Sequence, residues 1–222
     1  MDHQKAPGLL QPLRIPSWKW EDISMDIVTG LPKTSTGYDS IWVIVDRLTK
    51  VAQFIPVKKT MTLEKLTRLY IREIVTNYGV PVNIASDRDP RFVSRFWRSL
   101  HKALGTKLNF STAYHPQSDG QTERVNQCMD AYLRSMAFTE PKKWCSWLSL
   151  AEWWFNTSYQ TATKFTHFQC LYGFPPPQIG EISIPGPEDT EAHSFLEQRE
   201  LVQQQLKHSL LVAQEIMKKY AD

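Results

Sequence analysis

The stretch EDISMDIVTGLPKTSTGYDSIWVIVDRLTKVAQFIPV, residues 21–57, decides the fold of this chain. It holds three short runs rich in Ile, Val and aromatic residues, separated by short segments, the first of which is rich in Gly, Pro, Ser and Thr. Such runs favour strands, and short connections of this kind join antiparallel neighbours. We therefore predict three antiparallel strands, within residues 21–32, 40–50 and 51–57.

Beyond residue 60 the pattern changes to apolar residues recurring every three or four positions, which is typical of amphipathic helices. The periodicity predicts helices over residues 63–79, 91–105, 122–138 and 147–160. Short apolar runs predict strands over residues 82–87 and 107–111, and Pro and Gly predict a loop over 112–120. This order of elements indicates an α/β domain, with a mixed sheet of about five strands flanked by helices.

The ends of the chain differ in composition from this domain. Residues 1–20 contain three prolines and no clear period, so we expect an extended lead-in before a core of residues 21–174. Five prolines between residues 175 and 189 predict a linker, and residues 190–222 then predict a long polar helix as a C-terminal extension.

Composition excludes several classes of protein. The 222 residues are 41% hydrophobic, which is enough for a core and argues against disorder of the whole chain. No apolar run is long enough for a membrane span, and the N-terminus lacks a signal-peptide pattern. Three scattered cysteines favour neither a disulfide framework nor a zinc site, so we expect reduced thiols inside a cell.

The net charge of +3 is unevenly distributed. Residues 181–222 contain four basic and eight acidic side chains, whereas residues 1–180 contain 22 basic and 15 acidic ones. A surplus of this size is compatible with a polyanionic partner but is also common in domains that bind no nucleic acid.

Three acidic residues occupy positions that suit a metal site. Asp26 lies inside the first predicted strand, Asp87 at the carboxyl end of the fourth, and Glu123 near the start of the third predicted helix. Carboxylates that meet over one sheet edge repel each other unless cations lie between them, and hard oxygen ligands suit Mg²⁺.

Each of these acids also has a structural interpretation. Asp26 could pair with a basic residue in the core, Asp87 could form a turn or cap a helix, and Glu123 could be a first-turn acid favoured by the helix dipole. Three further acids lie close enough in sequence to exchange roles with them: Asp46, Asp89 and Asp119.

Longer blocks of sequence carry a family resemblance. The strings MDIVTGLP, SDRDPRFVSRFWRSLHKALGTKLNFSTAYHPQSDGQTERVNQ and WWFNTSYQ resemble the integrase catalytic core of gypsy-type LTR retrotransposons. Asp87 and Glu123 have 35 residues between them, the spacing of the retroviral-type DDE motif. The similarity runs from about residue 8 to residue 220, and the central block is highly specific.

The resemblance implies a ribonuclease-H-like fold with Asp26, Asp87 and Glu123 as the catalytic, metal-binding triad. Two Mg²⁺ ions, or Mn²⁺ in their place, would be bound, with Asp26 bridging both and each of the other two acids on one ion. The family also has a zinc-binding N-terminal domain and a C-terminal DNA- or chromatin-binding domain. This sequence contains neither, so we expect a core fragment or a degenerate reading frame.

Several residues are candidates for DNA contacts. Tyr114 and His115 offer stacking surfaces for an unpaired base, and the resemblance places their loop, with Gln117, near the cDNA end. Asn126 lies one turn after Glu123, on the same side of the helix. Arg91, Arg95, Arg98 and Lys102 form a stripe at helical spacing, which suits phosphate contacts but equally suits a solvated helix face.

The sequence-based hypothesis is a metal-dependent polynucleotidyl transferase with endonuclease activity, which processes cDNA 3′ ends and joins them to host DNA. The alternatives are a catalytically inactive DNA-binding or assembly remnant of a retroelement and a ribonuclease-H-like nuclease that only hydrolyses. Expected partners are LTR cDNA ends, host target DNA and further copies of the chain, with no membrane and no small-molecule cofactor. We expect it to act in the nucleus after a cytoplasmic particle stage.

Overall fold

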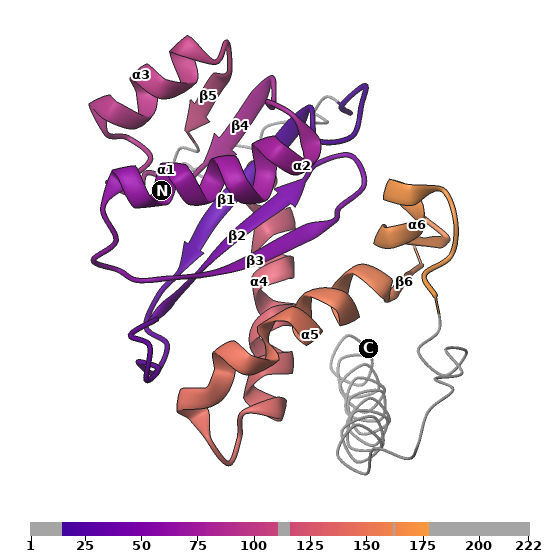
Figure 1. Cartoon of the computed structure of the whole chain (residues 1–222). Coiled ribbons are helices and arrows are strands. Elements are labelled where there is room, and N and C mark those ends of the chain that lie inside the picture. The colour runs from indigo at the N-terminus through magenta and orange to yellow at the C-terminus, as the bar shows by residue number, and fades with distance from the viewer. Residues whose placement is uncertain (1–14, 111–115, 162, 178–222) are drawn as a thin grey trace, which may run out of the picture. The chain divides into compact units, whose positions relative to one another are not determined.

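A five-stranded mixed sheet forms the centre of the larger part of the chain (Figure 1). The computed structural model describes residues 15–110, 116–161 and 163–177, with the backbone alone for residues 116–121. The strands lie in the order β3-β2-β1-β4-β5. Their bounds are β1 Asp22–Val28, β2 Ser40–Asp46, β3 Ala52–Val57, β4 Asn83–Ser86 and β5 Lys107–Phe110.

The predicted strands are confirmed, and so is the antiparallel pairing of the first three. β2 pairs antiparallel with both β1 and β3, while β4 pairs parallel with β1 and β5 pairs parallel with β4. Every residue of β2 is buried, which explains its nearly continuous apolar sequence. The mixed sheet predicted from the order of elements is therefore present.

Helices fill the connections and the second half of the described chain. The helical elements are α1 Leu63–Tyr70, η1 Ile71–Val75, α2 Thr76–Tyr78, α3 Arg95–Ala103, α4 Pro116–Met136, η2 Pro141–Lys143, α5 Trp144–Thr157 and α6 His167–Tyr172. A short hairpin of β6 Tyr159–Gln160 and β7 Phe165–Thr166 precedes α6. The helix predicted over 63–79 is present as the run α1, η1 and α2, whose middle is a π-helix.

Three predicted boundaries are wrong. The helix expected over residues 147–160 is α5, Trp144–Thr157, and the last two residues of the predicted range form β6. The helix expected from residue 91 begins at Arg95, because the Ser94 side chain caps it by accepting the Trp97 N–H at 3.2 Å. The loop expected over residues 112–120 is helical from Pro116 onward, because proline is well suited to the first position of a helix. Proline is also a common turn residue, which is why the sequence predicted a loop at this position.

An aromatic cluster packs α1 and α3 against one face of the sheet. The ring of Trp42 in β2 lies 6.2 Å from Tyr70 and 6.0 Å from Trp97, and the ring of His101 lies 4.6 Å from that of Trp97. All four side chains are fully buried. In Figure 1, α1 passes in front of the sheet and the start of α4 lies behind it. The aromatic cluster and α4 therefore cover opposite faces of the sheet.

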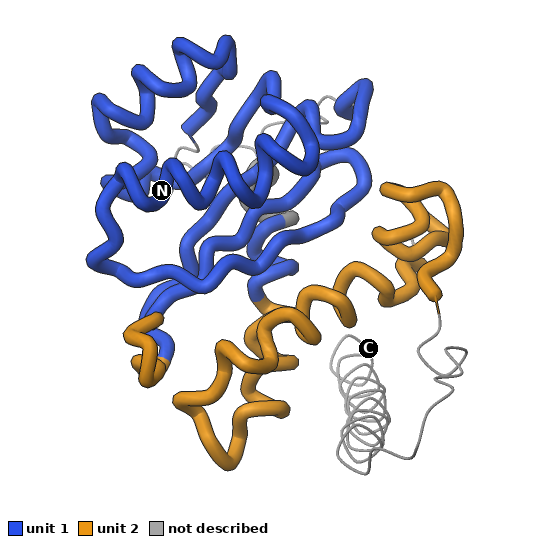
Figure 2. Tube along the Cα trace, viewed as in Figure 1, with its two compact units in different colours: residues 1–31, 39–126 blue, residues 32–38, 127–222 orange. Residues whose placement is uncertain are grey.

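The chain divides into two compact units (Figure 2). The first comprises residues 1–31 and 39–126 and contains the sheet. The second comprises residues 32–38 and 127–222, and in it the buried Trp144 donates its indole N–H to the Pro32 carbonyl at 2.8 Å.

The predicted terminal segments fall largely outside the described residues. This applies to most of the lead-in of residues 1–20, to most of the linker of residues 175–189 and to the whole extension of residues 190–222. Within the described part, no helix has the length and apolar character needed to cross a membrane.

Candidate active site

The register between β1 and β4 brings two of the three predicted acids to neighbouring positions. Met25 pairs with Ser86 in this parallel ladder, so Asp26 and Asp87 are the next residues along their chains. Partners in a parallel register share a face of the sheet, as Asn83 shows by donating to the Asp22 carboxylate at 2.6 Å. The ladder ends at the pair of Met25 and Ser86, and one further step of the same register would bring Asp87 beside Asp26.

The start of α4 lies along β1 on this same face. The Thr122 hydroxyl donates to the Ser24 hydroxyl at 2.9 Å, and Asn126 donates its amide N–H to Asp26 Oδ2 at 2.6 Å. Four helical residues rise about 6 Å and two strand residues about 6.6 Å, so the spacings match. Glu123 lies in α4 between these two contacts, which ties the third acid to the same region.

Asp26 is half-buried and held at both carboxylate oxygens. Oδ1 accepts the Ile27 N–H at 2.7 Å, and Oδ2 accepts from Asn126. No lysine or arginine of the described residues forms an ion pair with Asp26, so the alternative of a core ion pair finds no support within that part of the chain. The amide oxygen of Asn126 is buried and lacks a hydrogen-bond partner among described groups.

The structural alternatives for the other two acids have different outcomes. Asp87 accepts the Asp89 N–H at 3.1 Å, which is a turn contact, but the cap of α3 is Ser94. Glu123 is exposed and lies seven residues after the start of α4 at Pro116, so it is not a first-turn acid. The helix dipole therefore does not account for its position.

Two of the three rival acids are committed elsewhere. Asp46 is completely buried and accepts hydrogen bonds from the Trp20 N–H, the Leu48 N–H, and both the N–H and the hydroxyl of Thr49. Asp89 forms two side-chain hydrogen bonds with Arg91, at 2.7 and 2.6 Å. The side chain of Asp119 lies outside the described residues.

The Asp89–Arg91 pair also has an electrostatic signature. Burial disfavours the charge of Asp89, but the hydrogen bonds and the charge of Arg91 outweigh burial and hold the pKa of this carboxyl below its usual value. Asp89 is thus a partner for Arg91 beside Asp87.

The three predicted ligands do not form a closed metal shell in this structure. Among residues 15–110, 122–161 and 163–177, no three His, Cys, Asp or Glu side chains gather closely enough to hold an ion. The donor set is nonetheless chemically suited to Mg²⁺, because all three groups are carboxylates. Metal binding by Asp26, Asp87 and Glu123 stays a prediction.

The candidate DNA-contact residues that the structure describes lie in different environments. Tyr114, His115 and the side chain of Gln117 lie outside the described residues, and Asn126 contacts Asp26. Arg91 precedes α3 and is paired with Asp89, so its place in a helical stripe is wrong. Arg95 and Lys102 are exposed on α3. The Asn126–Asp26 hydrogen bond was not predicted from the sequence, and contact of Asn126 with DNA stays a prediction.

Comparison with known proteins adds the family. Over 220 residues, 99% of its length, the chain is 33% identical to the Transposon Tf2-3 polyprotein of Schizosaccharomyces pombe, and the Tf2-4 polyprotein matches equally. The chain is homologous to Tf2 retrotransposon polyproteins. It spans 16% of the length of these relatives. No protein-family model matches it.

Solved structures similar to this chain support the fold. A chain of the simian T-cell lymphotropic virus intasome in complex with PP2A regulatory subunit B56 gamma matches with a TM-score of 0.61 and 21% identity, covering 79% of this chain and 63% of that one. The HTLV-2 integrase catalytic core domain in complex with magnesium matches with a TM-score of 0.55 and 18% identity, over 68% of this chain and 96% of that one. The core of BIV integrase matches with a TM-score of 0.55 and 22% identity, over 68% and 93%. The chain therefore has the ribonuclease-H-like fold of integrase catalytic cores.

Proposed function

We propose that this chain is the catalytic core of a retrotransposon integrase, a polynucleotidyl transferase acting on DNA phosphodiesters. The observation that carries the proposal is the parallel pairing of β1 with β4 up to Met25 and Ser86, the residues just before Asp26 and Asp87, together with the hydrogen bond from Asn126 of α4 to Asp26. The homology to Tf2 polyproteins and the integrase-core fold support it.

Asp26, Asp87 and Glu123 are the proposed metal ligands. The magnesium in the HTLV-2 integrase core supports a divalent ion, and we expect two Mg²⁺ ions, or Mn²⁺, per site. Such ions supply charge neutralisation and activation of an attacking oxygen. The chain's own part is to hold the carboxylates, with Asn126 fixing the orientation of Asp26 through the 2.6 Å hydrogen bond.

The same site would serve two reactions. In end processing, a water oxygen attacks the phosphorus near the cDNA end, the bond to the neighbouring 3′ oxygen breaks, and a new 3′-hydroxyl forms. In joining, that 3′-hydroxyl loses its proton and attacks a phosphorus in host DNA, whose own 3′ oxygen leaves and takes up a proton. Because no covalent enzyme intermediate is needed, one set of carboxylates suffices for both.

The proposed partners follow from this chemistry. They are LTR cDNA ends, host target DNA and further copies of the chain in a homo-oligomer. The similarity to an intasome chain supports an assembly with DNA. We propose that the protein acts in the nucleus after a cytoplasmic particle stage.

A branched oligonucleotide tests the proposed chemistry without knowledge of the cDNA end. A Y-shaped DNA that holds a 3′-hydroxyl next to the branch phosphodiester makes the reverse of joining unimolecular, so assembly of two DNA molecules is not required. We expect the chain to reseal the branch in Mg²⁺ or Mn²⁺ but not in EDTA. Asp87→Asn should abolish resealing, whereas Glu64→Gln, a matched change of an exposed acid on α1, should leave it intact.

The other possible results of this assay would each contradict the proposed function. Cleavage of the branched DNA without resealing would indicate a hydrolysis-only nuclease. Binding of the DNA without any reaction would indicate an inactive remnant of a retroelement. Resealing by Asp87→Asn at the wild-type rate would refute the assignment of the acids.

A further inference from the structure

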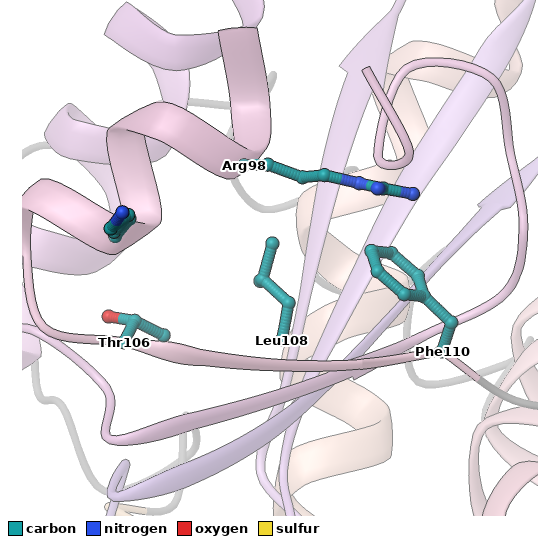
Figure 3. A pocket seen from close by; sticks show the side chains of 5 residues that line it. Arg98, Thr106, Leu108 and Phe110 are labelled. Carbon is teal, nitrogen blue, oxygen red and sulfur yellow. The ribbon is translucent and has the colours of Figure 1, made fainter. Parts of the chain in front are cut away.

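A cavity of ≈ 390 Å³ lies between α3 and β5, at the edge of the sheet (Figure 3). Its lining residues are Arg98, Lys102, Thr106, Leu108 and Phe110. Figure 3 shows Thr106 just before β5, Leu108 and Phe110 along β5, and Arg98 reaching from α3 toward Phe110. This cavity is largely open to solvent, as a surface groove is, and is not enclosed.

The walls of this cavity are built by tight local hydrogen bonds. Gly105 has a φ of 75°, a backbone conformation that favours glycine, and it turns the chain from α3 directly into β5. The Thr106 N–H then donates to the His101 carbonyl at 2.9 Å, and its hydroxyl donates to the Pro81 carbonyl at 2.7 Å. The Thr106 hydroxyl is thus committed to the fold, which leaves ligand recognition to the other four lining residues.

Two cations form the upper wall of the cavity. Arg98 and Lys102 are four residues apart on α3, so they lie on the same helix face, and both are exposed. No acidic side chain of the described residues forms an ion pair with either one. Like charges at this spacing destabilise a helix, and a bound anion would relieve that repulsion.

The lower wall is apolar and aromatic. Leu108 and Phe110 are half-buried on β5, which pairs with β4 alone and is therefore an edge strand of the sheet. The Arg98 guanidinium lies over the Phe110 ring, 5.4 Å from its centroid, and this contact holds the cation at the rim of the cavity. A free phosphate ion would contact only the two cations. A nucleotide would contact both walls, with its phosphate on the cations and its aromatic base on the apolar residues.

The cavity lies on the face of the sheet opposite to the candidate acids. Phe110 pairs with Ser86 in the parallel ladder, and Asp87 is the next residue after Ser86. Successive strand residues alternate between faces, so Phe110 lies on the α3 face of the sheet, whereas the side chain of Asp87 follows the opposite, α4 face.

We propose that the cavity between α3 and β5 binds one nucleotide of an unpaired DNA strand, with its phosphate on Arg98 and Lys102 and its base against Phe110 and Leu108. A base within a duplex is stacked on both faces and cannot lie on an aromatic ring, so the site selects single-stranded DNA. The proposal rests on the proposed function only in taking DNA as the polyanion. It adds a site for the strand outside the three carboxylates.

The test is binding of a fluorescein-labelled oligo(dT) 12-mer to the full chain, followed by anisotropy in EDTA, where metal-dependent chemistry is blocked. A duplex of the same length is the second probe. Phe110→Leu should weaken single-strand binding about tenfold, within the contribution of one base stacked on an aromatic ring, and should leave duplex binding unchanged. Phe96→Leu, a change of an exposed phenylalanine on α3 outside the cavity, is the matched control.

The cationic wall has its own readout. Lys102→Gln should reduce the salt dependence of single-strand binding by about 0.7 in the logarithmic slope, the value of one phosphate contact. Lys65→Gln, an identical charge change on the exposed surface of α1, should leave the slope unchanged. If thermal melting shows that Phe110→Leu does not fold, the salt dependence of Lys102→Gln tests the nucleotide site instead.

Several results would overturn the nucleotide site. These are no binding of the 12-mer by the wild type, equal losses of single-strand and duplex binding in Phe110→Leu, or the same loss in Phe96→Leu. Because resealing of the branched DNA is measured separately and in metal, failure of this site and failure of the proposed integrase activity are distinguishable.

Discussion

Asp26 shows at the residue scale how a carboxylate is kept in an apolar strand. Its neighbours Met25 and Ile27 are buried, and its own side chain is stabilised by an amide rather than by a cation. A neutral donor satisfies one carboxylate oxygen without cancelling the negative charge. The charge therefore remains available for a metal ion, which an arginine partner would have prevented.

Asn126 is consequently expected to act as a positioning residue for Asp26. Asn126→Ala should lower the rate of branched-DNA resealing at saturating substrate at least tenfold, in the range of outer-shell partners of metal ligands. DNA affinity and the unfolding midpoint should change little, because the contact is half-buried and water can replace the amide. Asn77→Ala, which removes an exposed amide on α2, is the control, and a full resealing rate in Asn126→Ala would contradict this role.

His101 makes stability depend on pH. Its ring is fully buried against Tyr70 and Trp97, and burial lowers its pKa to about 4. In the unfolded chain the pKa is about 6.5, so the unfolded state takes up the proton first as the pH falls. Stability is therefore full above pH 6.5 and is lost between pH 6.5 and 4, by about 2 kcal/mol at pH 5.

Urea unfolding at pH 8, 7, 6 and 5 measures this effect. The loss of stability below pH 6.5 should be much smaller in His101→Phe, which keeps an aromatic ring in the cluster but cannot be protonated. An equally steep decline in the variant would show that other groups cause the pH dependence.

At the scale of elements, the start of α3 is set by its N-cap, Ser94, and not by the apolar spacing, which predicts a start at residue 91. Ser94 accepts the Trp97 N–H at 3.2 Å and donates to the Arg91 carbonyl at 2.8 Å, so one hydroxyl both starts the helix and fixes the preceding turn. That turn carries the Asp89–Arg91 pair beside Asp87. The cap thus links the placement of α3 to the candidate site.

Ser94→Ala should destabilise the chain by about 1 kcal/mol, the usual contribution of a serine cap. Ser94→Asp should retain most of the stability, because aspartate caps helices equally well. Denaturant unfolding of the two variants and of the wild type checks this. Equal losses in both variants would indicate that the donation to Arg91, rather than the cap, is the important contact.

At the scale of the whole molecule, the proposed carboxylate cluster couples metal binding to folding. Three acids near one sheet edge repel one another without a cation, and an ion that binds the folded state alone stabilises it by mass action. We expect 10 mM MgCl₂ to raise the Tm relative to NaCl of equal ionic strength, by roughly 2–4 °C for each kcal/mol of stabilisation.

Asp87→Asn should lose most of this thermal shift, while Glu64→Gln should keep it. The measurement is independent of catalysis, so it tests the metal site even in an inactive protein. The same Mg²⁺-dependent shift in wild type and Asp87→Asn would place the ion elsewhere.

The sheet and the approximate extents of the helices were predictable because they depend on local patterns. Alternation and β-branched residues in β1 to β3, and apolar spacing in α1 and α5, report burial within a few residues of chain. The boundaries failed where a single side chain competes with periodicity, as Ser94 does at the start of α3. Pro116 was ambiguous because proline begins helices as readily as it forms turns.

By itself, the sequence determined the mixed α/β sheet, the candidate acids and the resemblance to an integrase core. Only the tertiary structure decided which polar groups meet: Asn126 with Asp26, Asp46 with its own turn and Trp20, and Arg98 with Phe110. The physical reason is distance along the chain. Propensity and periodicity act between near neighbours, whereas the contact of residues 100 positions apart depends on strand register and helix docking.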